Sequence, residues 1–171
     1  NDRPSSVCTD NSGNVYVTGF STGSGTGTDI ATIKYNSSGA QQWAARYNGT
    51  ANGDDFGVKV AADNSGNVYV AGYGAGTASG NDYVILKYNS SGVQQWISRF
   101  NGAGNGDDIL NSMITDASGN VFVTGKSTGA GTMEDILTVK YNSSGSQIWT
   151  ASFNGSANNY DEGFSVTADN S

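Results

Sequence analysis

The chain has 171 residues, of which 25 are glycine and only 36% are hydrophobic; this suits one domain of many short strands joined by turns. Its 15 acidic and 8 basic side chains give a net charge of −7, which disfavours nucleic acid and anionic membranes as partners. Histidine is absent, which excludes Ser/His/Asp and Cys/His mechanisms, and no apolar run approaches the roughly 20 residues that span a bilayer.

The sequence repeats itself with a period of 53 residues. The phrase DNSGNVYVTG at residues 10–19 returns as DNSGNVYVAG at 63–72 and as DASGNVFVTG at 116–125. A β-rich repeat of about 40 to 50 residues is typical of propeller blades. The chain therefore divides into repeat units 10–62, 63–115 and 116–168, with 1–9 and 169–171 in the phase of flanking blades.

Four strands are predicted in the first unit, at residues 15–18, 30–35, 41–47 and 56–61, where β-branched and aromatic residues gather between turn signals. The run at 83–88 in the second unit is apolar on both faces, as a sheet packed between two others requires. The predicted fold class is all-β: a β-propeller of three four-stranded antiparallel blades of 53 residues each, forming a partial ring. Residues 160–171 repeat the phase of 1–12 and add an extra innermost strand.

Two tight turns in each unit explain why the repeated phrases vary so little. Asp10-Asn11-Ser12-Gly13 places Asp first and Gly fourth in a type I turn, and Asn36-Ser37-Ser38-Gly39 does the same with Asn. The side-chain oxygen is expected to accept a backbone N–H, and Gly to adopt the left-handed conformation. A structural role in turns is therefore predicted for Asp10, Gly13, Asp63, Gly66, Asp116, Gly119, Asn36, Gly39, Asn89, Gly92, Asn142 and Gly145.

The longer connections, 19–29 and 48–55 in the first unit, are expected on the opposite face from these turns, where binding residues are often found. Acidic residues gather in them. Carboxylate oxygens suit Ca²⁺, but the alternating spacing of a dedicated calcium loop is missing, and Tyr160 replaces an Asp in the third unit. We predict that these carboxylates accept loop N–H groups, with no cofactor, no metal and no catalytic residue, and Ca²⁺ binding as the alternative. The candidate binding face comprises Asp29, Asp54, Asp55, Asp82, Asp107, Asp108, Asp135 and Asp161.

One tryptophan recurs at the same position of every unit, as Trp43, Trp96 and Trp149. Tryptophan can stack on sugars, but recurrence at one strand position favours packing between outer strands. We therefore predict a structural packing role for these three side chains.

The combination of DNSGNVYVTG, DIATIKYNSSG, a following Trp, YNG and NGDD resembles the bacterial SBBP family of β-propeller repeats, over the whole chain. The GNVYV phrase is also similar to NHL-type repeats, but the KYNSSG and Trp elements favour SBBP. The resemblance implies a propeller of the kind found in large secreted or surface-anchored bacterial proteins, with no known catalytic residues to transfer.

A closed propeller generally has four to eight blades, so three cannot close a ring. We therefore predict a non-enzymatic, extracellular or cell-surface scaffold or interaction module that is part of a larger chain or assembly. Its expected partners are proteins, namely other blades of a longer chain or further copies of itself, and polysaccharide is another candidate. One alternative is a polysaccharide- or Ca²⁺-dependent adhesion module. A second is a fragment of a propeller hydrolase or lyase with its active site elsewhere.

Overall fold

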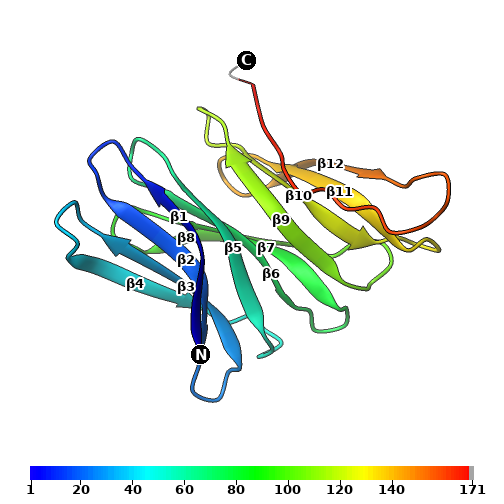
Figure 1. Cartoon of the computed structure of the whole chain (residues 1–171), viewed down its shortest axis with the longest axis horizontal. Coiled ribbons are helices and arrows are strands. Elements are labelled where there is room, and N and C mark those ends of the chain that lie inside the picture. Colours follow the sequence, from blue (N-terminus) through cyan, green and yellow to red (C-terminus); the bar gives the residue numbers. More distant parts are fainter. Residues whose placement is uncertain (170–171) are drawn as a thin grey trace.

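The computed structural model describes residues 1–169, and all regular elements in this range are β-strands, which form three separate sheets (Figure 1). Each sheet is called a blade here. Blade 1 contains β1 (Asp2–Thr9), β2 (Val15–Thr22), β3 (Thr28–Tyr35) and β4 (Gln41–Tyr47). Blade 2 contains β5 (Asp55–Ala62), β6 (Val68–Ala75), β7 (Asn81–Tyr88) and β8 (Gln94–Phe100). Blade 3 contains β9 (Asp108–Thr115), β10 (Val121–Thr128), β11 (Glu134–Tyr141) and β12 (Gln147–Phe153).

Within each blade every strand pairs antiparallel with the next strand of the chain. The first strands begin at Asp2, Asp55 and Asp108, 53 residues apart. The predicted fold class is thus confirmed: the chain forms three four-stranded antiparallel sheets, and they do not close into a ring.

The blades pack face to face, with their first strands innermost. Strand β5 of blade 2 contacts β1, β2 and β3 of blade 1, and β9 of blade 3 contacts β5, β6 and β7 in the same way. In Figure 1 these three inner strands, β1, β5 and β9, lie across the front of the molecule. Each blade is therefore held to the next by the inner strand of the later blade.

The hydrophobic core lies between the blades rather than within any one of them. One buried cluster joins blade 1 to blade 2 through Tyr16 and Ile30 on one side and Val70 and Leu86 on the other. A second cluster joins blade 2 to blade 3 and includes Ile85. Blade 2 is consequently buried on both faces, which explains the apolar run at 83–88. Burying each such side chain stabilises the fold by about 1.5–3 kcal/mol.

The tight turns join the first strand to the second and the third to the fourth. In the first turn, Oδ1 of Asp10 accepts the N–H groups of Ser12 (2.9 Å) and Asn14 (3.0 Å), and Gly13 has φ +74°. Oδ1 of Asn36 accepts the N–H groups of Ser38 and Ala40 in the second turn at 3.1 and 2.9 Å. The other blades have the same geometry.

We expect Asp63→Ala to lower the free energy of unfolding by about 1–2 kcal/mol. Asp63 accepts N–H groups from Ser65 and Asn67, both at 2.9 Å, and alanine removes this acceptor. Asp63→Asn is the control, because the second turn of each blade already uses Asn in this way and should lose less than half as much. Urea unfolding followed by circular dichroism measures both. Equal losses for the two variants would contradict the assigned role of the side-chain oxygen.

The expected extra innermost strand requires a correction. Residues 160–169 run beside blade 3 but form no strand, because no neighbouring strand in the described chain pairs with them. Their position is nevertheless that of an inner strand: Val166 N–H donates to Ser112 Oγ at 3.4 Å, as Val60 N–H donates to Ser6 Oγ. Gly163 N–H also donates to Gly125 O at 3.1 Å. Asn170 and Ser171, which belong to the predicted segment, lie outside the described residues.

Candidate functional site

The connections on the face opposite the tight turns are shorter than predicted. We expected a loop over residues 19–29, but β2 continues to Thr22 and β3 starts at Thr28, so the connection is 23–27. The extension forms because Ser21 pairs with Asp29 and Thr22 with Thr28 across the two strands. This moves Asp29 out of the loop and into a strand.

The acidic residues at the start of the third strands are buried, not exposed on an open binding face. Asp29, Asp82 and Asp135 are 3%, 7% and 9% exposed. Asp29 accepts the Thr26 hydroxyl at 2.9 Å and pairs with Arg46 at 2.7 Å. Asp82 has the corresponding partners, Ser79 at 2.7 Å and Arg99 at 3.1 Å. The sequence analysis did not identify either arginine.

The acidic residues where the interblade loops meet the first strands hold these loops in place. Oδ1 of Asp54 accepts Thr28 N–H and Oδ1 of Asp107 accepts Asn81 N–H, both at 2.8 Å. Asp55 and Asp108 are 1% and 0% exposed. Oδ2 of Asp55, Asp108 and Asp161 accepts the N–H of Gly49, Gly102 and Gly155, respectively, at 2.6 Å. These carboxylates thus fasten each loop to the blade before or after it.

Burial raises the pKa of two of these carboxyl groups, Asp55 and Asp108. It raises the pKa of Asp55 above 3.8, against the Gly49 hydrogen bond and the nearby Arg99, which lower it. Burial likewise raises the pKa of Asp108, against hydrogen bonds from Ser127 and Gly102. Among residues 1–169 no group of three or more acidic, Cys or His side chains could hold a metal ion.

The raised pKa values of Asp55 and Asp108 predict that these two groups stabilise the fold more at pH 4 than at pH 7. A carboxyl whose pKa is raised in the folded state contributes stability that is full below 3.8, its unfolded value, and is lost as pH rises through the raised pKa. Asp108→Asn should therefore flatten the fall in stability between pH 4 and 7. Urea midpoints at both pH values measure it.

The control is Asp107→Asn, which removes the exposed neighbouring carboxylate and so accounts for the loss of one charge from this loop. Asp108→Asn should flatten the slope more than this variant does. Asp10, in the first turn, acts in the opposite sense: hydrogen bonds, first of all from the Asn14 side chain, lower its pKa to about 2. Its contribution is present above 3.8 and lost as pH falls through about 2. If stability falls between pH 4 and 7 as steeply in Asp108→Asn as in the unaltered chain, the prediction is wrong.

The recurring tryptophans connect one blade to the next. Nε1 of Trp43 donates to the carbonyl of Ser90, and Nε1 of Trp96 to that of Ser143, both at 3.1 Å. The ring of Trp43 also lies against Gly92, in the same turn of the next blade. Trp149 has no later blade to contact in the described chain and is 41% exposed.

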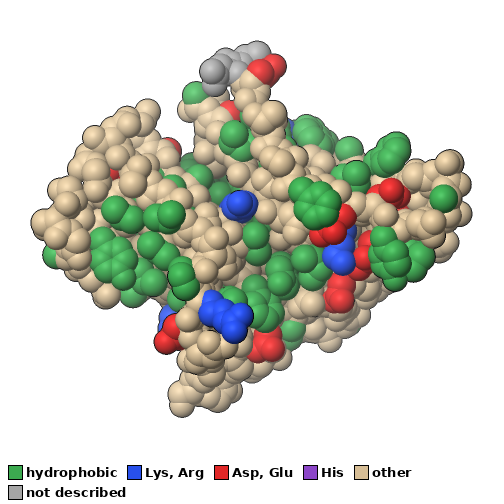
Figure 2. Space-filling model, viewed as in Figure 1, with side chains coloured by type: hydrophobic (Ala, Val, Ile, Leu, Met, Phe, Trp, Pro, Cys, Tyr) green, Lys and Arg blue, Asp and Glu red, His purple; other side chains and the backbone are tan. Residues whose placement is uncertain are grey.

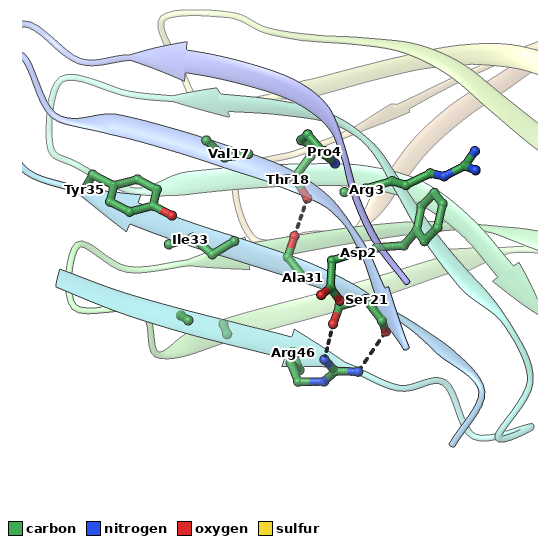
Figure 3. A pocket seen from close by; sticks show the side chains of 14 residues that line it. Asp2, Arg3, Pro4, Val17, Thr18, Ser21, Ala31, Ile33, Tyr35 and Arg46 are labelled. Atoms are coloured by element: carbon green, nitrogen blue, oxygen red, sulfur yellow. Dashed lines mark hydrogen bonds between the residues drawn. The ribbon is translucent and has the colours of Figure 1, made fainter. Parts of the chain in front are cut away.

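Blade 1 presents an apolar face on the side away from blade 2. A groove of about 460 Å³ runs over it, lined by Val17, Ile33 and Tyr35 together with other side chains of β1 to β4. Figure 3 shows these side chains on neighbouring strands, with Arg46 bonded to Ser21 at the far end of the groove. Figure 2 shows apolar side chains gathered over this part of the molecule, at the left of the view.

Blade 3 presents the opposite kind of face, the one that blades 1 and 2 use to contact the blade that follows. Its Phe122 and Trp149 rings lie tilted against each other, with 6.4 Å between their centroids. Phe153 is 63% exposed on the same outer strand as Trp149, and the segment 160–169 covers only the inner part of the face. The two ends of the array are therefore the two halves of an interblade interface.

Comparison with known protein families identifies the repeat. Residues 42–83 and 95–131 match the SBBP β-propeller repeat. These two segments are SBBP β-propeller repeats. No curated protein matches the sequence.

Each SBBP match spans parts of two blades. The first runs from β4 of blade 1 into β7 of blade 2, and the second from β8 of blade 2 into the connection before β11. Each match thus includes a tryptophan of one blade and the first two strands of the next. The interface between blades is consequently part of the SBBP repeat itself.

Within the repeat, one position next to the buried carboxylates differs between blades. Arg46 and Arg99 occupy it in blades 1 and 2, but Ser152 occupies it in blade 3. A position-by-position comparison of the three units would have revealed this difference in the sequence. The described chain also contains no helix long and apolar enough to cross a membrane.

Proposed function

We propose that this chain is a non-catalytic propeller scaffold of an extracellular or cell-surface protein, and that further blades of the same repeat cover its open faces. The observation that carries the proposal is the apolar face of blade 1. The extracellular location rests on the kind of protein in which this repeat is expected.

The open face of blade 1 uses the same positions that are buried in the other blades. Val17 and Ile33 are partly exposed there. The equivalent pairs, Val70 and Leu86 in blade 2 and Val123 and Val139 in blade 3, are all 0% exposed. The preceding blade supplies that cover, since the side chains of blade 1 pack against Val70 and Leu86. A further blade is therefore the partner whose shape and chemistry fit this face.

The first test compares two masses: that of the intact polypeptide in its native source and that of the native particle. We expect either a polypeptide well above 17.6 kDa, whose additional blades cover the faces, or a particle that is a multiple of a 17.6 kDa chain. A 17.6 kDa polypeptide that stays monomeric at all concentrations would refute the proposal.

A variant pair tests the face itself. Ile33→Asp places a charge at the centre of the groove and should abolish association with the preceding blade. Gln95→Glu, on the outer strand of blade 2, is the matched control, because Gln95 is exposed in the described array, and this variant should associate as the unaltered chain does. If Ile33→Asp associates over the same concentration range as the unaltered chain, this face is not the contact.

A further inference from the structure

A pocket of about 200 Å³ lies between blade 2 and blade 3. Its lining includes Phe100 from the end of β8, Ser127 and Thr128 from the end of β10, and Asp135 and Ser152 from the outer strands of blade 3. The pocket lies within the described array and not on either open face. A ligand in it is therefore independent of the docking proposed above.

The preceding junction, between blade 1 and blade 2, shows what this space holds when it is filled. There Nη2 of Arg99 donates to the carbonyls of Gly74 and Ala75, both at 2.9 Å. The same nitrogen forms an ion pair with Oδ2 of Asp82 at 3.1 Å. Nη1 of Arg99 reaches the hydroxyl of Tyr47 in blade 1 at 3.4 Å. The guanidinium thus joins a buried carboxylate, two carbonyls and an aromatic residue.

Each of these partners has its equivalent in the pocket, 53 residues later in the sequence. Ser127 and Thr128 replace Gly74 and Ala75, Asp135 replaces Asp82, and Phe100 replaces Tyr47. The group that is missing is the cation, because serine stands at position 152. The pocket therefore has the lining of a guanidinium site without the arginine.

The carboxylate in this pocket is short of partners. Asp135 is only 9% exposed, and its Oδ1 accepts no hydrogen bond, while Oδ2 accepts the Thr132 hydroxyl at 3.0 Å. Oδ1 of Asp29 also lacks a hydrogen bond, but that carboxylate has its ion pair with Arg46. Within residues 1–169 Asp135 forms no ion pair. A buried carboxylate without a cation carries an uncompensated desolvation cost, and a cation of the right shape would offset it.

A second buried carboxylate lies in the same row of the sheet. Ser127 pairs with Asp108 on one side and with Asp135 on the other, just as Gly74 pairs with Asp55 and Asp82 in blade 2. Asp108 is 0% exposed. Asp108 adds negative charge near the pocket but does not line it. One lining carboxylate, Asp135, with an apolar wall of Phe100 and Leu137 suits a planar organic cation better than a metal ion, which takes more oxygen ligands.

We propose that the pocket between blades 2 and 3 binds a guanidinium cation, supplied by an arginine side chain of a partner or by a free guanidino compound. The guanidinium donates to Oδ2 of Asp135 and to the carbonyls of Ser127 and Thr128, and its plane lies against Phe100. The same carboxylate oxygen pairs with arginine at the equivalent positions of blades 1 and 2. Recognition of this kind is charge-assisted and geometrically specific, because the guanidinium offers several donors in one plane.

The test titrates the 171-residue chain with methylguanidinium chloride, followed by calorimetry and by the amide NMR shifts of Thr128 and Asp135. We expect one site with a dissociation constant of about 10 mM or lower. Methylammonium chloride at the same ionic strength is the ligand control and should bind at least about tenfold more weakly. No saturable binding, or equal binding of the two cations, would overturn the proposal.

Two variants test the geometry. Ser152→Arg supplies the missing side chain, so it should abolish methylguanidinium binding and raise the melting temperature. Arg99→Ser creates the same vacancy at the preceding junction and should raise the number of sites from one to two. If Arg99→Ser does not fold, Ser152→Arg decides alone: unchanged binding in that variant refutes the site.

The source of the cation is decided by a peptide. An acetylated and amidated Gly-Arg-Gly peptide is compared with methylguanidinium on the unaltered chain. Tighter binding of the peptide identifies an arginine side chain as the ligand, and tighter binding of methylguanidinium identifies a free guanidino compound. Binding of neither would overturn the proposal.

Discussion

Trp96→Ala is expected to lower the free energy of unfolding by about 3–5 kcal/mol, whereas Trp149→Ala should change it by less than about 1 kcal/mol. The same residue stands at the same position of successive blades, so local propensities are matched. Trp96 donates to the Ser143 carbonyl and lies against Gly145, both in the turn of the next blade. Trp149 has no such turn to contact in the described chain and is 41% exposed.

The measurement is urea unfolding followed by far-UV circular dichroism, because tryptophan fluorescence changes with the substitution itself. Trp43→Ala provides a third value, since it contacts blade 2 as Trp96 contacts blade 3, and it should resemble Trp96→Ala. Equal losses at Trp96 and Trp149 would mean that the tryptophans stabilise their own blades. The interblade role assigned to them would then be wrong.

The tandem arrangement of strands could be predicted from the sequence because its signals are local. A side-chain oxygen at the first turn position and glycine at the fourth fix the ends of adjacent strands, as in Asp10 and Gly13. Aromatic and β-branched runs between these turns then place the strands. The repeat period supplies the number of blades, and the structure confirms a fold of three four-stranded sheets.

The ends of the strands opposite the tight turns could not be predicted in this way. Ser21, Thr22 and Thr28 are polar, and glycines surround them, so they look like loop residues. They join the sheet because cross-strand pairing continues past Gly19, where β2 approaches β1 too closely for any side chain. That proximity is a property of the folded blade, not of the local sequence.

The burial of the acidic residues was also beyond local reasoning. Asp55 looks like a loop carboxylate, but the glycine at position 74 leaves room for it inside the blade. Its pairing with Gly49 N–H depends on a loop that returns from the preceding blade. The sequence analysis did predict that such carboxylates accept loop N–H groups, and Asp54 and Asp55 do so.

The described structure also predicts that Gly72→Ala will destabilise the chain more than any single side-chain truncation on the surface. A Cβ at position 72 would lie 1.9 Å from the carbonyl oxygen of Phe56, which belongs to the backbone of β5 and cannot rotate away. The contact occurs beside an irregularity in strand pairing between Gly57 and Lys59. We expect a loss of at least about 3 kcal/mol, and separation of β5 from β6.

Gly131→Ala is the matched control, because no atom lies within 4 Å of a Cβ there. Its φ of +88° makes the substitution costly only through backbone strain of about 1–2 kcal/mol.

Hydrogen exchange of the β5 and β6 amides distinguishes the two mechanisms. In Gly72→Ala these amides should exchange faster than those of β10 and β11, because the clash separates the inner strand from its own blade. Since β5 also joins blade 2 to blade 1, its release should weaken that interface as well. If Gly72→Ala retains full hydrogen-exchange protection of the β5 amides, the inner strand can shift without loss of stability. The close approach at this glycine would then not hold the blades in register.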